Sequence, residues 1–250
     1  MALTIEILAL LLIIAFIAGW VDTVAGGGGL ITIPTLILAG VSPESAIATN
    51  KLQGSVGTFT AAAYFSRKKT VSLSRLKWAM LATFCGSVFG SWLLLKIDSD
   101  TLVIFLPILL IAIGSYFLFS SNVSDEERKE KLTLVLFALT VCPLLGLYDG
   151  FFGPGTGSMM ALAFVVLLGF SLAKATANAK ILNFVSNISS LGYFILFGDI
   201  NFIAGLVMML GQFFGALMGA RMVLKNGSKL IKPVVVIACF VMSVSLLLNP

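Results

Sequence analysis

The chain has 250 residues, of which 59% are hydrophobic and 11% are charged, and its mean hydropathy is +1.08. Soluble domains average about 45–50% apolar and about 25% charged residues, so this composition excludes an ordinary soluble enzyme and a disordered chain. The net charge of +5 is carried by short basic clusters between apolar runs, which is typical of cytoplasmic loops of membrane proteins. We therefore predict an all-α polytopic membrane protein that binds no nucleic acid.

Catalytic and metal-binding side chains are scarce. The chain has no histidine, which excludes His-based acid–base catalysis and the usual zinc sites. Cys85, Cys142 and Cys239 lie far apart inside apolar runs, without metal or disulfide spacing, and we expect buried, inert thiols. No nucleophile–base pair or redox motif is present in the sequence. We expect neither an enzyme nor a cofactor nor a bound metal.

Apolar runs define the expected membrane segments, since a spanning helix needs about 20 apolar residues. The first run has neither a basic leader nor a small-residue cleavage site and is expected to be a mature helix rather than a signal peptide. Two regions, 3–40 and 131–170, each hold two shorter apolar pieces around a Gly-rich interruption. These interruptions are GWVDTVAGGGG (19–29) and GLYDGFFGPGTG (146–157). The runs of spanning length are 44–66, 74–97, 101–120, 174–198, 200–224 and 230–249.

The two interruptions resemble each other, and so do the segments that follow them. SAIATNKLQ (45–53) aligns with KATANAKIL (174–182). The chain is therefore predicted to be a duplication of about 125 residues. Its parts are a first membrane repeat (1–119), a cytoplasmic polar linker (120–131) and a second membrane repeat (132–250). The matched pairs are Asp22/Asp149, Gly26/Gly153, Gly28/Gly155, Ala46/Ala175, Ala48/Ala177, Lys51/Lys180, Tyr64/Tyr193, Phe65/Phe194, Gly86/Gly211 and Gly90/Gly215.

The distribution of Lys and Arg predicts the relative orientation of the repeats. With five membrane segments in each half, the second half is inverted, and Lys96 is the one loop cation that falls outside. If each interrupted pair crossed only once, the repeats would be parallel and the cations would divide almost evenly. The positive-inside rule favours two inverted repeats of about five segments, with both termini outside and the Gly-rich breaks near mid-membrane. Whether 30–40 crosses fully is left open.

Four ionisable residues fall within membrane segments or their breaks: Asp22, Lys51, Asp149 and Lys180. A charged side chain at the bilayer centre costs at least about 2.5–3.5 kcal/mol, so such residues usually face a partner or a polar cavity. One interpretation is that the aspartates form structural ion pairs with the lysines. The other is that these residues line a substrate path, in which the aspartates balance the lysines and accept protons for coupling.

Small and polar residues follow each lysine on one helix face. If helices restart near Leu30 and Ser158, backbone N–H groups and positive helix ends also point into the breaks. Lysines together with N–H donors favour an anion, although Ser, Thr and Asn also hold membrane helices together. The faces are Gly54, Ser55, Thr58 and Ala62 after Lys51, and Asn183, Asn187 and Ser190 after Lys180, with Thr176 one turn back. The expected substrate-binding residues are Lys51, Lys180, Gly26, Gly27, Gly28, Gly153, Gly155, Asn50 and Asn183.

These motifs closely resemble the TauE/SafE sulfite-exporter family. The resemblance rests on the segment 19–40 followed by SAIATNKLQ, and on GLYDGFFGPGTGS followed by KATANAK, and it covers nearly the whole chain. It implies a bacterial inner-membrane secondary transporter, frequently an exporter, of sulfite, a sulfonate or a related oxyanion. The expected partners are this anion and the lipid bilayer, with a homodimer as one option.

Two other functions stay open at this point. The protein could be a membrane scaffold without transport, in which the polar faces only hold helices together. It could also carry a metal cation coupled to the two aspartates. Binding of an oxyanion would eliminate the scaffold.

Overall fold

The computed structural model describes residues 4–97 and 127–226, which form eight α-helices joined by short connections. The expected segments 101–120 and 230–249, Cys239 and most of the linker lie outside the described residues. The helices are α1 (Ile5–Ala25), α2 (Gly28–Leu38), α3 (Pro43–Arg67), α4 (Leu73–Leu94), α6 (Leu134–Phe151), α7 (Thr156–Leu168), α8 (Leu172–Phe197) and α9 (Phe202–Asn226).

Local sequence explains where several helices begin and end. The hydroxyl of Thr4 caps the start of α1, and that of Ser42 caps α3, which has Pro43 in its first turn. Gly26 ends α1 with a left-handed conformation (φ 76°), which glycine adopts without steric cost, and its N–H donates to the Asp22 carbonyl at 2.7 Å. Gly169 ends α7 in the same way (φ 68°).

By length and composition, α1, α6, α8 and α9 could each cross a membrane. The spans expected at 174–198 and 200–224 therefore correspond to α8 and α9. The runs at 44–66 and 74–97 form α3 and α4, which have spanning lengths of 25 and 22 residues but fall outside this apolar group. Buried polar side chains along α3 and the charged start of α4 account for their lower hydropathy.

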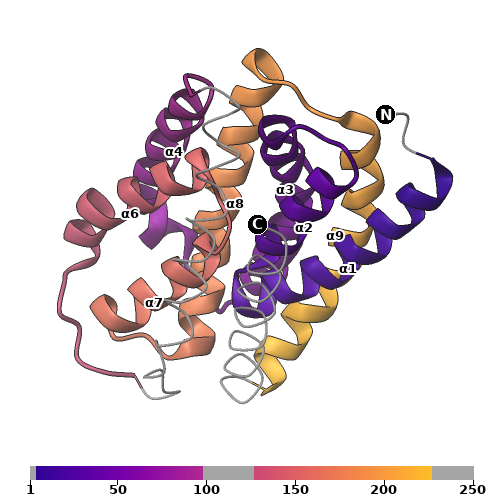
Figure 1. Ribbon diagram of the computed structural model, residues 1–250. Coiled ribbons are helices and arrows are strands. Elements are labelled where there is room, and N and C mark those ends of the chain that lie inside the picture. Colours follow the sequence, from indigo (N-terminus) through magenta and orange to yellow (C-terminus); the bar gives the residue numbers. More distant parts are fainter. Residues whose placement is uncertain (1–3, 98–126, 227–250) are drawn as a thin grey trace, which may run out of the picture.

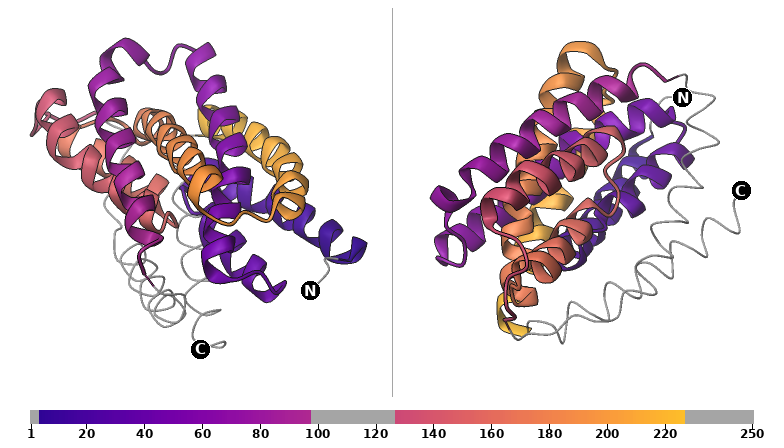
Figure 2. Two further views of the ribbon diagram at one scale, coloured as in Figure 1. Left: turned by 90° about the horizontal axis from the view of Figure 1, so that it is seen from above. Right: turned by 90° about the vertical axis from the view of Figure 1, so that its left-hand side faces the viewer.

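In each expected repeat, one helix packs mainly against a helix of the other repeat. α9 packs along α1, α4 packs along α6, and α3 lies against α8 between these two pairs (Figures 1 and 2). The close approach depends on glycine: a methyl group at Gly90 would lie 2.7 Å from the Phe151 nitrogen, and one at Gly211 would lie 2.7 Å from the Phe16 nitrogen. These glycines therefore serve helix packing, as expected for small residues in membrane helices.

Buried apolar residues form two separate clusters. α3 runs from the first cluster to the second, whereas α8 runs from the second to the first. The pairs α1/α6 and α4/α9 are likewise opposed, and the buried apolar residues of α2 and α7 belong to different clusters. The first cluster includes Leu11, Ala15, Leu30, Ile33, Ile47, Leu94, Phe152, Phe194, Ala204 and Met208, and the second includes Val24, Ala62, Phe65, Leu76, Phe137, Cys142, Phe164, Leu182 and Val223.

The helix breaks are narrower than the sequence predicted. The first comprises only Gly26–Gly27 and the second Phe152–Gly155, so Asp22 and Asp149 lie in the last turns of α1 and α6. α2 and α7 begin two residues earlier than expected, at Gly28 and Thr156. Helices α1 and α6 continue past their aspartates, and the left-handed glycines Gly26, Gly153 and Gly155 allow the chain to reverse after them.

The outer surface of the helices is strongly apolar. Exposed large side chains include Trp78, Leu81, Phe84 and Phe89 of α4, which is typical of a surface that faces lipid. Cys142 is buried, as expected. The prediction of a buried Cys85 is wrong: it is exposed on α4, because the face that packs on α6 is taken by Gly86 and Gly90.

Candidate functional site

Asp22, Lys51, Asp149 and Lys180 form two ion pairs, and each pair joins the first half of the chain to the second. Lys51 Nζ lies 3.1 Å from Asp149 Oδ1, and Lys180 Nζ lies 2.7 Å from Asp22 Oδ2. Both lysines are buried, with side-chain exposures of 0% and 1%. Pairing within each repeat would have satisfied the same sequence symmetry. The ion pairs instead connect α3 to α6 and α8 to α1.

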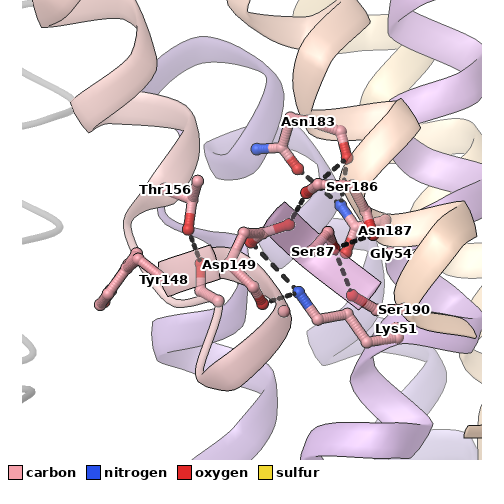
Figure 3. Close-up of polar contacts among 12 residues, drawn as sticks. Lys51, Gly54, Ser87, Tyr148, Asp149, Thr156, Asn183, Ser186, Asn187 and Ser190 are labelled. Atoms are coloured by element: carbon pink, nitrogen blue, oxygen red, sulfur yellow. Dashed lines mark hydrogen bonds and ion pairs between the residues drawn. The ribbon is translucent and has the colours of Figure 1, made fainter. Parts of the chain in front are cut away.

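The Lys51–Asp149 pair is enclosed by further hydrogen bonds (Figure 3). Lys51 Nζ also donates to the backbone carbonyl of Asp149, and the Ser186 hydroxyl donates to Asp149 Oδ2. Asp149 has a side-chain exposure of only 2%. Because both of its carboxylate oxygens and the lysine have partners, this pair is compensated within the protein.

The Lys180–Asp22 pair has different surroundings. Asp22 Oδ1 accepts the N–H of Gly28 at 3.2 Å, at the start of α2, while Oδ2 accepts from Lys180. Its side-chain exposure is 16%. Asp22 therefore connects a lysine with the positive end of a helix, where a carboxylate is favourable.

A small polar cavity lies between the two ion pairs. Its volume is about 20 Å³, which is enough for one water-sized group. The start of α2, the second break, α3, α8 and α9 contribute to its wall, together with the aspartates of α1 and α6. Its lining residues are Asp22, Gly28, Gly29, Asn50, Gly54, Thr58, Asp149, Gly153, Asn183, Asn187 and Gln212.

Hydrogen bonds fix the orientation of the two expected asparagines. Asn50 Oδ1 accepts from the Thr32 hydroxyl at 2.6 Å and from Gln53 Nε2 at 2.8 Å. Asn183 Oδ1 accepts from Asn187 Nδ2 at 2.5 Å. In each case the oxygen is engaged, so the NH₂ group is the end left to face the breaks. Two amide donors therefore join the two ammonium groups around the cavity.

The first break touches the start of α7. A methyl group at Gly26 would lie 2.7 Å from Gly157 Cα, and the Ser158 hydroxyl donates to the Ala25 carbonyl. A methyl group at Gly157 would also lie 3.1 Å from Lys180 Nζ. Gly26 of the first break thus contacts the first turn of α7, which directly follows the second break, and Lys180 lies close to the same turn.

The predicted site residues divide into three groups. Gly28, Asn50, Gly153 and Asn183 line the cavity directly, together with both aspartates. Lys51 and Lys180 reach it through those aspartates. Among the described residues, Gly26, Gly27 and Gly155 do not contribute to its wall: Gly26 is the tip contact, and Gly27 and Gly155 are the N-caps of α2 and α7.

The polar faces combine both interpretations. Gly54, Thr58, Asn183 and Asn187 line the cavity. Ser190 instead contacts Ser87 across α8 and α4, with 2.6 Å between the hydroxyl oxygens. Further along these faces, polar residues therefore hold helices together, as in other membrane bundles.

Sequence reasoning missed Gln212, which lines the cavity from α9 and is 3% exposed. A signal was available, because Gln212 is the one amide between Phe202 and Leu224 and follows the matched glycine Gly211. Its counterpart in the first repeat is Ser87, which follows Gly86.

Comparison with known proteins agrees with this architecture. The family model described as "Sulfite exporter TauE/SafE" matches residues 11–246. The chain belongs to the TauE/SafE family. It is 51% identical over 241 residues to the "Probable membrane transporter protein YfcA" of Escherichia coli K12, covering 96% of this chain and 90% of that protein. A "Probable membrane transporter protein" of Haemophilus influenzae is 49% identical, covering 97% and 95%, and no solved structure matches. The expected family is confirmed, and it is a family of membrane transporters.

Proposed function

We propose that this protein is a secondary transporter of a small sulfur oxyanion or organosulfonate, such as sulfite, and that it exports this anion from the bacterial cytoplasm across the inner membrane. The observation that carries the proposal is the cavity between two cross-repeat Lys–Asp pairs, beside the two helix breaks. Two asparagine side chains and the N-terminus of α2 line this cavity, and the two ammonium groups are paired with the two aspartates of its wall. The amides, the helix N-terminus and the ammonium groups are donors for a compact, multivalent oxygen anion.

The alternating-access part of this proposal uses inverted repeats. The opposed directions of α3 and α8, and of α1 and α6, between the two apolar clusters support it. The described loop cations support the orientation. Lys96 lies beside Leu94 and Leu95 of the first cluster. Five others lie within two residues, along the chain, of second-cluster residues: Arg67, Lys77, Lys131, Lys174 and Arg221. The second-cluster end is therefore the cytoplasmic one in this proposal.

Transport is tested in proteoliposomes that contain the full chain. Sulfite flux is measured with and without an imposed proton gradient, beside methanesulfonate and sulfate. Lys180→Ala should abolish flux. Lys174→Ala is the matched control, because Lys174 is an exposed lysine on the same helix that pairs with Glu127 at 2.9 Å. Normal sulfite flux by Lys180→Ala would contradict the proposal.

The same preparation distinguishes the other functions. Thermal stabilisation by a divalent cation but by none of these anions would favour a cation transporter. Stabilisation by neither class would favour a scaffold.

Orientation is tested by single cysteines at exposed loop positions. In a background free of native cysteines, Ser72→Cys and Asp199→Cys should react with a membrane-impermeant maleimide from opposite sides. Labelling from the same side would overturn the inverted arrangement.

A further inference from the structure

The two ion pairs occupy matched positions in the repeats but have different neighbours. Ser186 lies six residues after Lys180, and its hydroxyl donates to Asp149. The corresponding position after Lys51 is Gly57, which has no hydroxyl to offer Asp22. Asp22 accepts instead from the backbone N–H of Gly28. One carboxylate is thus held by a side chain and the other by the end of a helix.

The donors that hold Asp22 are those an incoming anion needs. Lys180 supplies an ammonium group, and Gly28 supplies an N–H at the positive end of α2. Asp22 and Gly28 line the cavity, and Lys180 is bonded to Asp22, so a ligand that moved this carboxylate aside would meet both donors. A carboxylate and a small oxyanion both present negatively charged oxygens that accept from such donors. Asp22 therefore fills the place of an anion.

Gln212 gives an independent indication that a ligand belongs on this side. It is 3% exposed, it lines the cavity, and its side-chain amide has no hydrogen bond to any of the described residues. An amide that lines a cavity without a protein partner normally binds water or a ligand there. Its counterpart Ser87 is fully used, since it donates to the Ser186 carbonyl at 2.7 Å and contacts the Ser190 hydroxyl.

The small volume of the cavity also indicates that the anion binds on the Asp22 side. A volume of about 20 Å³ accepts a water-sized group but not a sulfite ion. Room must come from the movement of a lining side chain. Asp149 is held by Lys51 and Ser186 at 2% exposure, whereas Asp22 is 16% exposed and held by two groups that an anion can take over. Asp22 is the group that can leave.

We propose that the anion site is asymmetric: the substrate anion displaces the Asp22 carboxylate from Lys180 and the Gly28 N–H and contacts Gln212, while the Lys51–Asp149 pair stays closed as a structural link. This inference rests on the proposed function and adds which half of the site takes the anion. Asp22 is a placeholder that competes with substrate, and Gln212 is an additional substrate-binding residue.

The test compares Asp22→Asn with Asp149→Asn, two substitutions that keep shape and remove charge. Purified full-length protein in detergent is titrated with sulfite, and thermal unfolding and apparent Kd are recorded. Asp22→Asn should lower the apparent Kd about tenfold if the carboxylate otherwise occupies the donors about nine-tenths of the time. Asp149→Asn should unfold at a lower temperature without sulfite and should not bind more tightly than the wild type.

The outcomes separate this inference from the proposed function. Weaker sulfite binding by Asp22→Asn, or equal effects of the two substitutions, would overturn the asymmetric site and leave anion transport in place. If wild type and Asp22→Asn both fail to bind sulfite, sulfate and methanesulfonate, the proposed function fails and this inference fails with it. Tighter binding by Asp22→Asn alone supports both.

Discussion

The two helix breaks reverse the chain with different bonds. In the first, Gly26–Gly27, the start of α2 is held by the carboxylate of Asp22. In the second, Phe152–Gly155, the Tyr148 hydroxyl donates to the Pro154 carbonyl at 2.7 Å. The first break is thus closed by a charge and the second by a neutral hydrogen bond. A charged ligand would compete directly with the carboxylate that holds the first break.

The largest expected difference between the two sides is in stability. Lys51→Ala leaves Asp149 buried without its counter-ion, and breaking a buried ion pair costs about 3–5 kcal/mol. Lys180→Ala should cost less, because Asp22 keeps the Gly28 N–H and is 16% exposed. Thermal or denaturant unfolding of both variants in detergent, without anion, measures the difference. Equal destabilisation would show that the two pairs are equivalent.

A substitution at the tip of the first break should have the next largest effect. Gly26 has φ +76° and lies against Gly157, so Gly26→Ala introduces strain of about 1–3 kcal/mol and separates the breaks. Gly192→Ala is the control, because nothing lies within 4 Å of the added methyl group. The control should be neutral or stabilising by up to about 1 kcal/mol, since alanine is the better helix former. A lower unfolding temperature for Gly192→Ala than for Gly26→Ala would refute this.

Gln212 and Ser87 hold matched positions on α9 and α4, so substitutions of them compare the two sides by anion binding and by stability. Gln212→Leu should weaken sulfite binding about tenfold, the value of one hydrogen bond to a charged group, with little change in stability. Ser87→Ala should lower stability by about 0.6 kcal/mol, typical of an interhelical hydrogen bond in a membrane, and leave the apparent Kd unchanged. Isothermal titration with sulfite and thermal unfolding give the two values. The reverse pattern would assign the ligand to the other side of the cavity.

The smallest effect is expected at the second break. Tyr148→Phe removes the hydrogen bond to Pro154 and should cost about 0.6 kcal/mol. Its counterpart in the first repeat is Val21, so the first break has no equivalent bond to lose. Sulfite affinity should not change, because Tyr148 does not line the cavity. A changed affinity would mean that the second break also takes part in binding.

Much of the architecture could be predicted from the sequence because its signals are local. The lengths of the apolar runs predict the helices, and the Gly-rich motifs predict where the helices break. The symmetry of Asp22 with Asp149 and of Lys51 with Lys180 indicated the charged residues of the site. These signals are patterns of residue type and spacing, and the sequence alone contains them.

The partners of these residues could not be predicted in the same way. Asp22 could pair with Lys51 or with Lys180 without violating the repeat symmetry, and only the three-dimensional arrangement of α1, α3, α6 and α8 decides the pairing. In the sequence, Gln212 is one polar residue in an apolar helix. Its place at the cavity depends on the packing of α9 against α1 and α3. The asymmetry between Gly57 and Ser186 is visible in the sequence, but its meaning depends on which carboxylate lies nearby.

The interleaving of the repeats has a consequence for biosynthesis. Asp149, the partner of Lys51, follows it after 98 residues, and Lys180, the partner of Asp22, follows after 158 residues. Both partners are therefore synthesised late. At about 5–20 residues per second, α3 waits about 5–20 s on the ribosome before Asp149 has been made. During that time the insertion machinery must shelter an unpaired lysine on a helix of low hydropathy. Assembly of this transporter is therefore completed late, when α6 and α8 arrive and neutralise the charges of helices already synthesised.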